Sequence, residues 1–309
     1  LVNEPPMFMT PVKMAEIARR VARTNRCAIK VFNERQIERM RMGGLLGVAV
    51  GSSQPPRFVH LTYRAPGAKK TIAIVGKGIT FDSGGLCLKP ADGMLPMKDD
   101  MGGAAAVIGL FSVIRRLKPK VNVHGIFAAT ENMPGGRAFK PGDVLKAMNG
   151  KTIEVVNTDA EGRLILADAL SYASRLKPDE IVDMATLTGA CVVALGESIT
   201  GAFGTDQGFI DRLIASGKKA GEKFWQLPLE TDYREMIKSD IADIKNSGGR
   251  WGGAITAALF LKEFVGEKQV WAHLDIAGPV MAKEKGGYRT SGATGVPVRT
   301  LLRYLASQD

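Results

Sequence analysis

Strand-like and helix-like segments alternate along this chain of 309 residues. Short β-branched or apolar runs bounded by glycine and proline indicate strands, and longer stretches with apolar residues at helical spacing indicate helices. The alternation predicts an α/β fold, with a mainly parallel, mixed sheet covered by helices on both faces. Strands are expected over residues 27–32, 58–63, 71–75, 121–130, 153–157, 181–187 and 271–275, and helices over 11–23, 33–42, 102–117, 163–175, 209–221, 254–264 and 298–306.

The chain has the composition of a globular protein that can bury a large core, because 45% of its residues are apolar and 24% are charged. Single α/β domains reach this length, and no internal repeat or linker divides the sequence. We therefore expect one domain over residues 1–309. The longest apolar stretch, residues 101–114, is shorter than the ~20 residues that span a bilayer, so no membrane segment is predicted.

Charge and cysteine content give weaker indications of partner and compartment. The net charge of +11 could attract nucleic acid or another acidic partner, but the basic residues are scattered and favour an ordinary solvated surface. Cys27, Cys87 and Cys191 match no disulfide or metal-ribbon spacing, and no secretory signal is visible at the amino terminus. These features predict a reducing compartment, the cytoplasm, and a packing role for Cys87.

Charged and polar residues follow three of the predicted strands, at the sheet edge where ligands bind in open α/β folds. The first strand leads into the glycine-rich loop 76–85, and the third leads into residues 185–189, whose hydroxyls could line a pocket. After the second strand, Asp159, Glu161 and Arg163 recur every two residues, so an extended backbone would direct all three to one side. The first loop and the segment after it supply Lys77, Asp82, Lys89 and Asp100.

Four carboxylates gathered in one crevice would repel one another unless cations compensated them. Carboxylate oxygens suit Mg²⁺, Mn²⁺ and Zn²⁺, whereas His60, His124 and His273 are too few and too scattered for a histidine-rich site. Two such ions ~3.5 to 4 Å apart can activate a water, polarise a carbonyl and stabilise a tetrahedral oxyanion. The pattern therefore favours hydrolysis at a site of two metal ions.

Each motif also has a simpler interpretation. The loop 76–85 could be a plain turn or a phosphate cradle, although it fits neither common phosphate-binding pattern and Asp82 would repel a phosphate. Asp159 and Glu161 could instead favour the start of the following helix through its dipole. Of the adjacent Asp99 and Asp100, we expect at most one to point inward while the other is solvated.

Residues 157–164, Asn-Thr-Asp-Ala-Glu-Gly-Arg-Leu, match the signature of the leucine aminopeptidase (cytosol aminopeptidase) family at every position. Residues 75–85, 97–104 and 274–278 also resemble this family, so the similarity covers nearly the whole chain. It implies a metallo-exopeptidase-like catalytic domain that removes amino-terminal Leu or other apolar residues from peptides. A Cys-Gly dipeptidase, a nucleic-acid-binding regulator and an inactive scaffold remain alternatives. The scaffold is disfavoured because every metal-binding and catalytic position of the family pattern is filled.

The resemblance also implies roles for individual residues. Two divalent ions, Zn²⁺ or Mn²⁺ and possibly Mg²⁺ or Co²⁺, would be held by Lys77, Asp82, Asp100, Asp159 and Glu161. As a ligand, the Lys77 amine would have to be neutral. Lys89 would stabilise the developing oxyanion, and Arg163 would hold a bicarbonate that relays a proton. The substrate site would be lined by Met97, Asn157, Thr186, Leu187 and Gly189.

The resemblance further implies a cytoplasmic homohexamer acting on peptide substrates, without a membrane partner. Family members carry a smaller domain of ~150 residues ahead of the catalytic one, and this domain is absent from the chain. Residues 1–309 are accordingly expected to be the single catalytic domain. Glu4 stands where the family usually has a smaller residue, so the hinge between domains is expected to differ.

Overall fold

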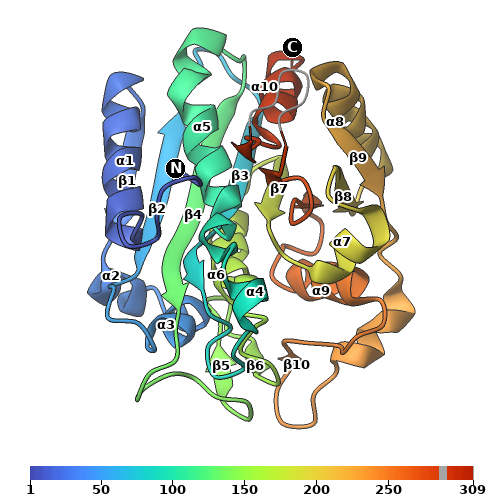
Figure 1. The fold of residues 1–309 in the computed structure, drawn as a ribbon. Helices are drawn as coiled ribbons and strands as arrows, with labels where there is room; N and C mark the ends of the chain where they lie inside the picture. Colours follow the sequence, from blue (N-terminus) through green and yellow to red (C-terminus); the bar gives the residue numbers. More distant parts are fainter. Residues whose placement is uncertain (285–290, 309) are drawn as a thin grey trace.

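The computed structural model describes residues 1–284 and 291–308, and a twisted eight-stranded sheet forms its centre (Figure 1). The strand order is β1-β2-β4-β3-β7-β11-β8-β9. Neighbouring strands from β4 to β11 run parallel, whereas β1, β2 and β8 introduce antiparallel pairings. The predicted mainly parallel, mixed sheet is confirmed. Its strands are β1 (Ala28–Phe32), β2 (Arg57–Tyr63), β3 (Thr71–Asp82), β4 (Asn122–Asn132), β7 (Glu180–Ala185), β8 (Ile199–Gly204), β9 (Lys223–Gln226) and β11 (Val270–Asp275).

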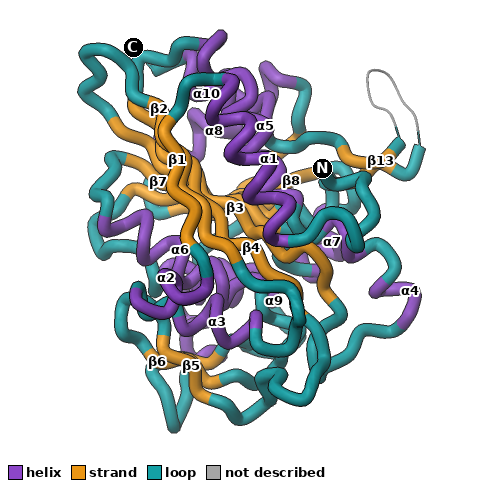
Figure 2. Tube along the Cα trace, turned by 90° about the vertical axis from the view of Figure 1, so that its left-hand side faces the viewer, coloured by secondary structure: helices purple, strands orange, loops and turns teal. Residues whose placement is uncertain are grey.

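Helices cover both faces of the sheet, as the sequence predicted (Figure 2). One face packs against α1 (Pro11–Thr24), α5 (Gly102–Leu117), α8 (Gln207–Ala220) and α10 (Val298–Ala306). The other packs against α2 (Glu34–Arg39), α3 (Gly43–Ala49), α6 (Gly162–Arg175) and α9 (Gly253–Lys262). Two further helices are α4 (Ala91–Met94) and α7 (Gly189–Leu195). No helix within the described ranges is both long and apolar enough to cross a membrane.

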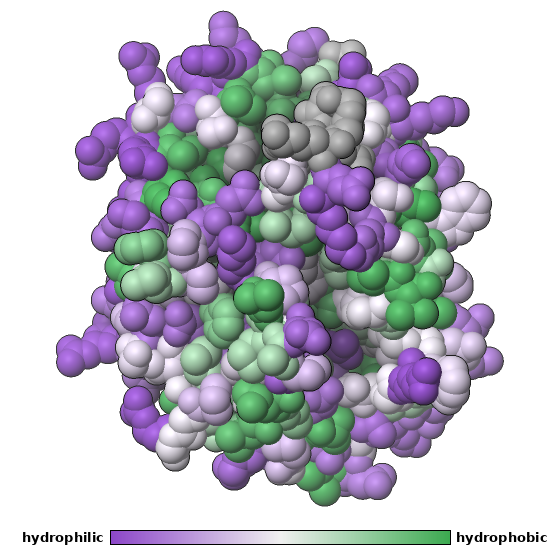
Figure 3. All heavy atoms as spheres, viewed as in Figure 1, coloured by the Kyte–Doolittle hydropathy of each residue, from purple (hydrophilic) through white to green (hydrophobic). Residues whose placement is uncertain are grey.

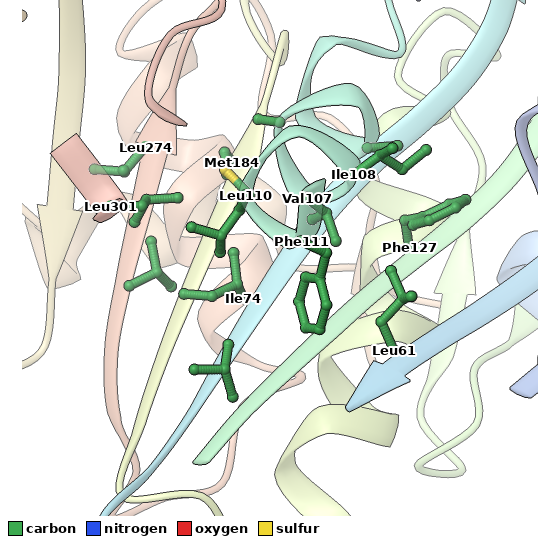
Figure 4. Close-up of a cluster of buried hydrophobic side chains, with 14 of the residues drawn as sticks. Leu61, Ile74, Val107, Ile108, Leu110, Phe111, Phe127, Met184, Leu274 and Leu301 are labelled. Carbon is green, nitrogen blue, oxygen red and sulfur yellow. The ribbon is translucent and has the colours of Figure 1, made fainter. Parts of the chain in front are cut away.

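Apolar side chains from the central strands and from α5 form much of the core on one face (Figure 4). Ile74 of β3 and Leu61 of β2 lie there with Val107 and Phe111 of α5, and all four are fully buried. Because helices cover both faces, β3 reads as a nearly continuous apolar run rather than an alternating one. Because β3 is packed on both sides, the position of its polar carboxyl end at the edge of the sheet is fixed.

Gly76 and Gly78, which follow the predicted strand 71–75, lie inside the observed strand rather than beyond its end. β3 runs from Thr71 to Asp82, not to residue 75. A Cβ on Gly76 would lie 2.4 Å from the backbone of Gly103 in α5, and one on Gly78 would lie 2.5 Å from the Ala128 carbonyl oxygen in β4. These glycines permit close packing on β3.

Two other segments also differ from expectation. The predicted strand 153–157 is the shorter β6 (Thr152–Glu154), which belongs to a separate small sheet with β5 (Val144–Lys146) and β10 (Ile244–Lys245). The predicted helix 33–42 is two helices. Asn33 and Gln36 form a capping box that starts α2, and Arg41, in a left-handed conformation, separates α2 from α3.

A buried carboxyl group on α6 ties this helix to two other segments. Asp168 is fully buried, and its Oδ2 accepts a hydrogen bond from the Leu45 amide at 2.8 Å while its Oδ1 accepts one from the Met148 amide at 2.7 Å. Leu45 lies in α3, and Met148 follows β5. Burial raises the pKa of Asp168 to about 7, although these backbone donors oppose the rise.

We expect Asp168→Ala to lower the free energy of unfolding by about 2–4 kcal/mol, because two buried amides lose their acceptors. Urea denaturation followed by circular dichroism measures the change. Asp211→Ala is the control, since Asp211 is exposed on α8 and its side chain accepts a hydrogen bond from Gln207 on the same helix. Equal stability of the two variants would contradict the role given to Asp168.

The pH dependence of the free energy of unfolding should also reveal the raised pKa of Asp168. Because its folded pKa is raised from 3.8 to about 7, the folded state holds this proton more tightly than the unfolded state. The contribution is therefore greatest below pH ~4 and is lost as pH rises toward 7. Between these values the stability of the wild type should fall relative to that of Asp168→Asn, measured by urea denaturation at several pH values. Parallel pH profiles would argue against the raised pKa.

Candidate metal centre

Three segments bring charged and hydroxyl-bearing side chains together at the carboxyl edge of the parallel strands. The end of β3 leads into residues 83–89, residues 157–161 precede α6, and residues 186–188 follow β7. The space-filling view, seen as in Figure 1, shows a hollow near the middle of this face, beside the region of α4 (Figure 3).

Lys77 is the most enclosed cation of the site. It lies within β3, and its Nζ contacts Asp100 Oδ1 at 2.7 Å and Glu161 Oε1 at 2.9 Å. The same amine donates to the Thr186 carbonyl oxygen at 3.0 Å. A Cβ on Gly162 would lie 2.4 Å from Lys77 Cε, so the glycine at the start of α6 makes room for this side chain.

Lys89 links the other two carboxylates. Its Nζ lies 2.9 Å from Asp82 Oδ2 and 2.5 Å from Asp159 Oδ1, and its side chain is only 16% exposed. The intervening loop turns at Gly84, whose φ of +86° favours glycine. The structure thus brings together all five predicted metal ligands and Lys89, from segments far apart in the chain.

The buried charges shift one another's pKa values. Burial alone would lower the pKa of both lysines, but the neighbouring carboxylates outweigh it and hold the pKa of Lys77 and Lys89 above the usual value. Burial raises the pKa of Asp100, Asp159 and Glu161, and carboxylate neighbours add to the rise. In this arrangement the two lysines compensate the carboxylates, with Lys77 as an ammonium. A neutral Lys77 remains a prediction for the metal-bound protein.

The donor atoms suit divalent cations. One carboxylate oxygen each from Asp82, Asp159 and Glu161 lie within 4.8 Å of one another. Asp100 Oδ2 and Glu161 Oε2 are buried and have no hydrogen-bond partner in the described part of the chain. Such unsatisfied oxygens, together with one amine, match the ligands that Mn²⁺, Zn²⁺, Mg²⁺ or Co²⁺ accept.

Arg163 offers a place for an anion. This side chain, in the first turn of α6, is 8% exposed, and its Nη1 donates to the carbonyl oxygen of Asn246 at 2.8 Å. Its Nε is buried without a partner among the described residues. Burial lowers the pKa of Arg163 to about 10, which still leaves the guanidinium charged at neutral pH. A free donor on a buried cation fits the expected bicarbonate.

The predicted substrate residues lie in the segments around the cluster. Thr186 Oγ1 donates to Asp100 Oδ1 at 2.7 Å, and Asn157 Oδ1 accepts from the Asp159 amide at 2.9 Å. Leu187 is half-buried, whereas Gly189, the first residue of α7, is exposed. Met97 is half-buried in a short 3₁₀ helix (Met97–Asp99) that packs against β3.

Two expectations about local geometry are wrong. Residues 157–161 form a turn rather than an extended stretch, and Glu161 already has helical angles. Its side chain makes no capping hydrogen bond, so the helix-cap interpretation receives no support for this residue. Asp99 was expected to be solvated if Asp100 pointed inward, yet both are buried. Burial raises the pKa of Asp99 to about 6, so this carboxyl binds a proton more readily than an exposed one.

Sequence reasoning missed two residues that hold the site together. Asn132 is the last residue of β4, and its Nδ2 donates to Asp82 Oδ1 at 2.8 Å and to the Thr158 carbonyl oxygen at 3.0 Å. Asp275, given no role, accepts hydrogen bonds from the Leu187 amide and the Thr188 hydroxyl. Both residues end a parallel strand, which is the signal that could have identified them.

The histidines are less scattered than the sequence indicated. His60 Nε2 lies 2.8 Å from His124 Nδ1, and His60 Nδ1 lies 3.0 Å from the Tyr172 hydroxyl. His273 Nδ1 bonds Asp183 Oδ1 at 2.6 Å. These contacts do not involve the five predicted metal ligands, so the oxygen-rich interpretation of the centre is unaffected.

Comparisons with known proteins identify relatives by sequence and by structure. Residues 1–302 match the sequence profile described as "Cytosol aminopeptidase family, catalytic domain". A protein of Persephonella marina named "Probable cytosol aminopeptidase" is 54% identical over 310 residues, covering 100% of this chain and 62% of its own length. A protein of the same name from Aquifex aeolicus is also 54% identical, covering 99% of this chain and 62% of its own length. The chain thus spans about three fifths of the length of these relatives.

Solved structures share the fold at substantial identity. The "Bottromycin maturation enzyme BotP in complex with Mn" matches with a TM-score of 0.95 and 43% identity, over 99% of this chain and 68% of that one. A tomato leucine aminopeptidase mutant matches with a TM-score of 0.91 and 45% identity, over 99% of this chain and 58% of that one. These neighbours confirm the α/β fold class.

We expect Lys77→Met to lower the free energy of unfolding of the metal-free protein by about 3–5 kcal/mol, because Asp100 and Glu161 lose a buried counter-charge. Urea denaturation in the presence of a chelator measures this. Lys13→Met is the control, since Lys13 pairs with Glu16 at the surface and should change stability by less than about 1 kcal/mol. Similar losses for both variants would show that Lys77 does not compensate the cluster.

Proposed function

Since the chain belongs to the cytosol aminopeptidase family, we propose that it is the catalytic part of a two-metal aminopeptidase. The proposed reaction is hydrolysis of the amino-terminal residue of a peptide, preferably Leu or another apolar residue. The activity is assigned to the whole protein, because the matched relatives are longer than this chain.

One observation carries the proposal: Asp82, Asp100, Asp159 and Glu161 converge with two lysines at one sheet edge. Lys77 and Lys89 supply two positive charges against these four carboxylates, so the cluster favours the binding of further cations. The unsatisfied oxygens of Asp100 and Glu161 support occupation by metal ions. A neighbour of 43% identity was solved with Mn, which is consistent with this choice.

The metal ligands we propose are Lys77, Asp82, Asp100, Asp159 and Glu161. When bound, two divalent ions would supply the Lewis acidity that activates a water and polarises the scissile carbonyl. Zn²⁺ and Mn²⁺ are the first candidates, with Mg²⁺ and Co²⁺ next. The protein's own contribution is to hold the carboxylates in place, through Thr186 on Asp100 and Asn132 on Asp82.

Lys89 and Arg163 are proposed as the catalytic cations. The carboxylates keep the Lys89 amine protonated, so its Nζ can donate a hydrogen bond to a negative oxygen that develops on the substrate carbonyl. Arg163 has a free Nε with which to hold bicarbonate as a proton carrier. Both side chains are largely buried, which strengthens their interaction with an anionic species.

Substrate binding is assigned to Met97, Asn157, Thr186, Leu187 and Gly189. Met97 and Leu187 offer apolar contact to the side chain of the departing residue. The backbone around Leu187 is fixed by Asp275, so its peptide groups are held ready for hydrogen bonds with the substrate backbone. We further propose a cytoplasmic homohexamer, with nucleic acid disfavoured as the main partner.

The decisive experiment is hydrolysis of a leucyl anilide by purified protein, before and after chelation and after addition of Mn²⁺ or Zn²⁺. Activity should disappear with the chelator and return with metal. Asp159→Ala and Glu161→Ala should each lower kcat by at least about 100-fold, because each removes a ligand of the ions that activate the water.

Two outcomes would count against the proposal. Activity that persists through exhaustive chelation would exclude the metal mechanism. A metal-loaded protein that binds Mn²⁺ but hydrolyses no aminoacyl substrate, with the full-length protein equally inactive, would exclude the aminopeptidase assignment. A higher rate on cysteinylglycine than on leucyl peptides would correct the substrate preference only.

A further inference from the structure

Asn246 lies directly after β10 and is fully buried against the turn that carries two of the proposed metal ligands. Its backbone amide donates to the Glu154 carbonyl oxygen at 2.9 Å, which continues the pairing of β10 with β6. The residue is thereby anchored to the small sheet, at the point where the chain leaves β6 for the turn at 157–161.

The side chain of Asn246 bonds to both ends of this turn. Its Oδ1 accepts from the amides of Val156 at 2.9 Å and Asn157 at 3.3 Å. Its Nδ2 donates to the carbonyl oxygens of Asn157 at 2.7 Å and Ala160 at 3.4 Å. A carboxamide alone among similarly shaped side chains offers two acceptor sites and two donors, so all four contacts depend on asparagine.

The backbone of the same residue holds the proposed catalytic arginine. The carbonyl oxygen of Asn246 accepts from Arg163 Nη1 at 2.8 Å. One residue therefore contacts the turn on both sides of Asp159 and also the guanidinium that follows Glu161. These contacts join residues more than 80 positions apart in sequence.

From these contacts we propose that Asn246 is a positioning residue of the metal centre, which sets the turn bearing Asp159 and Glu161 and the direction of Arg163. The inference rests on the proposed function. A hydrogen-bonded residue behind the ligands fixes their orientation before the ions bind, so that the ligands need not be ordered when binding occurs. Asn246 itself touches neither substrate nor metal in this scheme.

The test uses the full chain and two substitutions. Asn246→Asp keeps the shape and the acceptor oxygen but removes both donors, and Asn246→Ser keeps a hydroxyl and introduces no charge. Mn²⁺ affinity is measured by competition with a chelator. The kinetic constants kcat and KM are measured with a leucyl anilide at saturating Mn²⁺, and the melting temperature is measured without metal. Asn122→Asp is the matched control. Asn122 also makes side-chain hydrogen bonds, but it is the first residue of β4, at the end of the strand away from Asn132 and the metal centre.

Both Asn246 variants should raise the Kd for Mn²⁺ by about 10- to 100-fold, the usual effect of removing a partner behind a ligand. At saturating Mn²⁺ their kcat should remain lower than that of the wild type while KM changes less, because the turn and the residue-246 carbonyl oxygen that orients Arg163 are then held less firmly. Asn122→Asp should change neither quantity. Should Asn246→Asp fail to fold, Asn246→Ser alone decides the comparison.

A Kd for Mn²⁺ within about twofold of the wild type in the Asn246 variants would overturn the inference, even if their melting temperature fell. Such a result would leave Asn246 with a structural role only. If the wild type binds Mn²⁺ but neither it nor the full-length protein hydrolyses a substrate, the proposed function fails, and the Kd comparison still decides whether Asn246 positions the ligands. If the wild type binds no Mn²⁺, both are wrong.

Discussion

Electrostatic compensation within the carboxylate cluster is the constraint on which the rest of the site depends. Lys77 and Lys89 each contact two carboxylates, so each of the four acidic side chains of the cluster has a cation beside it in the absence of metal. The fold can therefore form before ions bind, although Asp100 and Glu161 keep unsatisfied oxygens. The same lysines would have different tasks once metal entered, one as a ligand and one as a donor to the substrate.

Close packing around β3 places these charges. Gly76 and Gly78 let α5 and β4 approach the strand, and Gly162 leaves room for the Lys77 side chain. Asn132, at the end of β4, and Asp275, at the end of β11, then fix the segments on either side. The chemical groups are thus held by the Asn132 carboxamide, by the Asp275 carboxylate bonded to a neutral amide and a hydroxyl, and by the shape of the backbone.

Much of the fold and the charged centre could be predicted from the sequence, because strong periodicity and polar residues at strand ends are local signals. The boundaries of β3 could not be predicted, because a single sequence does not distinguish a glycine that ends a strand from one that lets a helix pack closely against it. The turn before α6 was misjudged because its shape comes from Asn246, far along the chain. The burial of Asp99 beside Asp100 likewise depends on tertiary packing.

The position of β11 has a consequence for biosynthesis. This strand is late in the sequence, yet it lies between β7 and β8, and it ends in the carboxylate that holds the segment after β7. A chain emerging from the ribosome therefore exposes Asp82, Asp100, Asp159 and Glu161 before it exposes this strand of the sheet. The edge of the sheet on which these carboxylates converge is therefore complete only once residues 270–275, made after all four of them, have taken their place between β7 and β8.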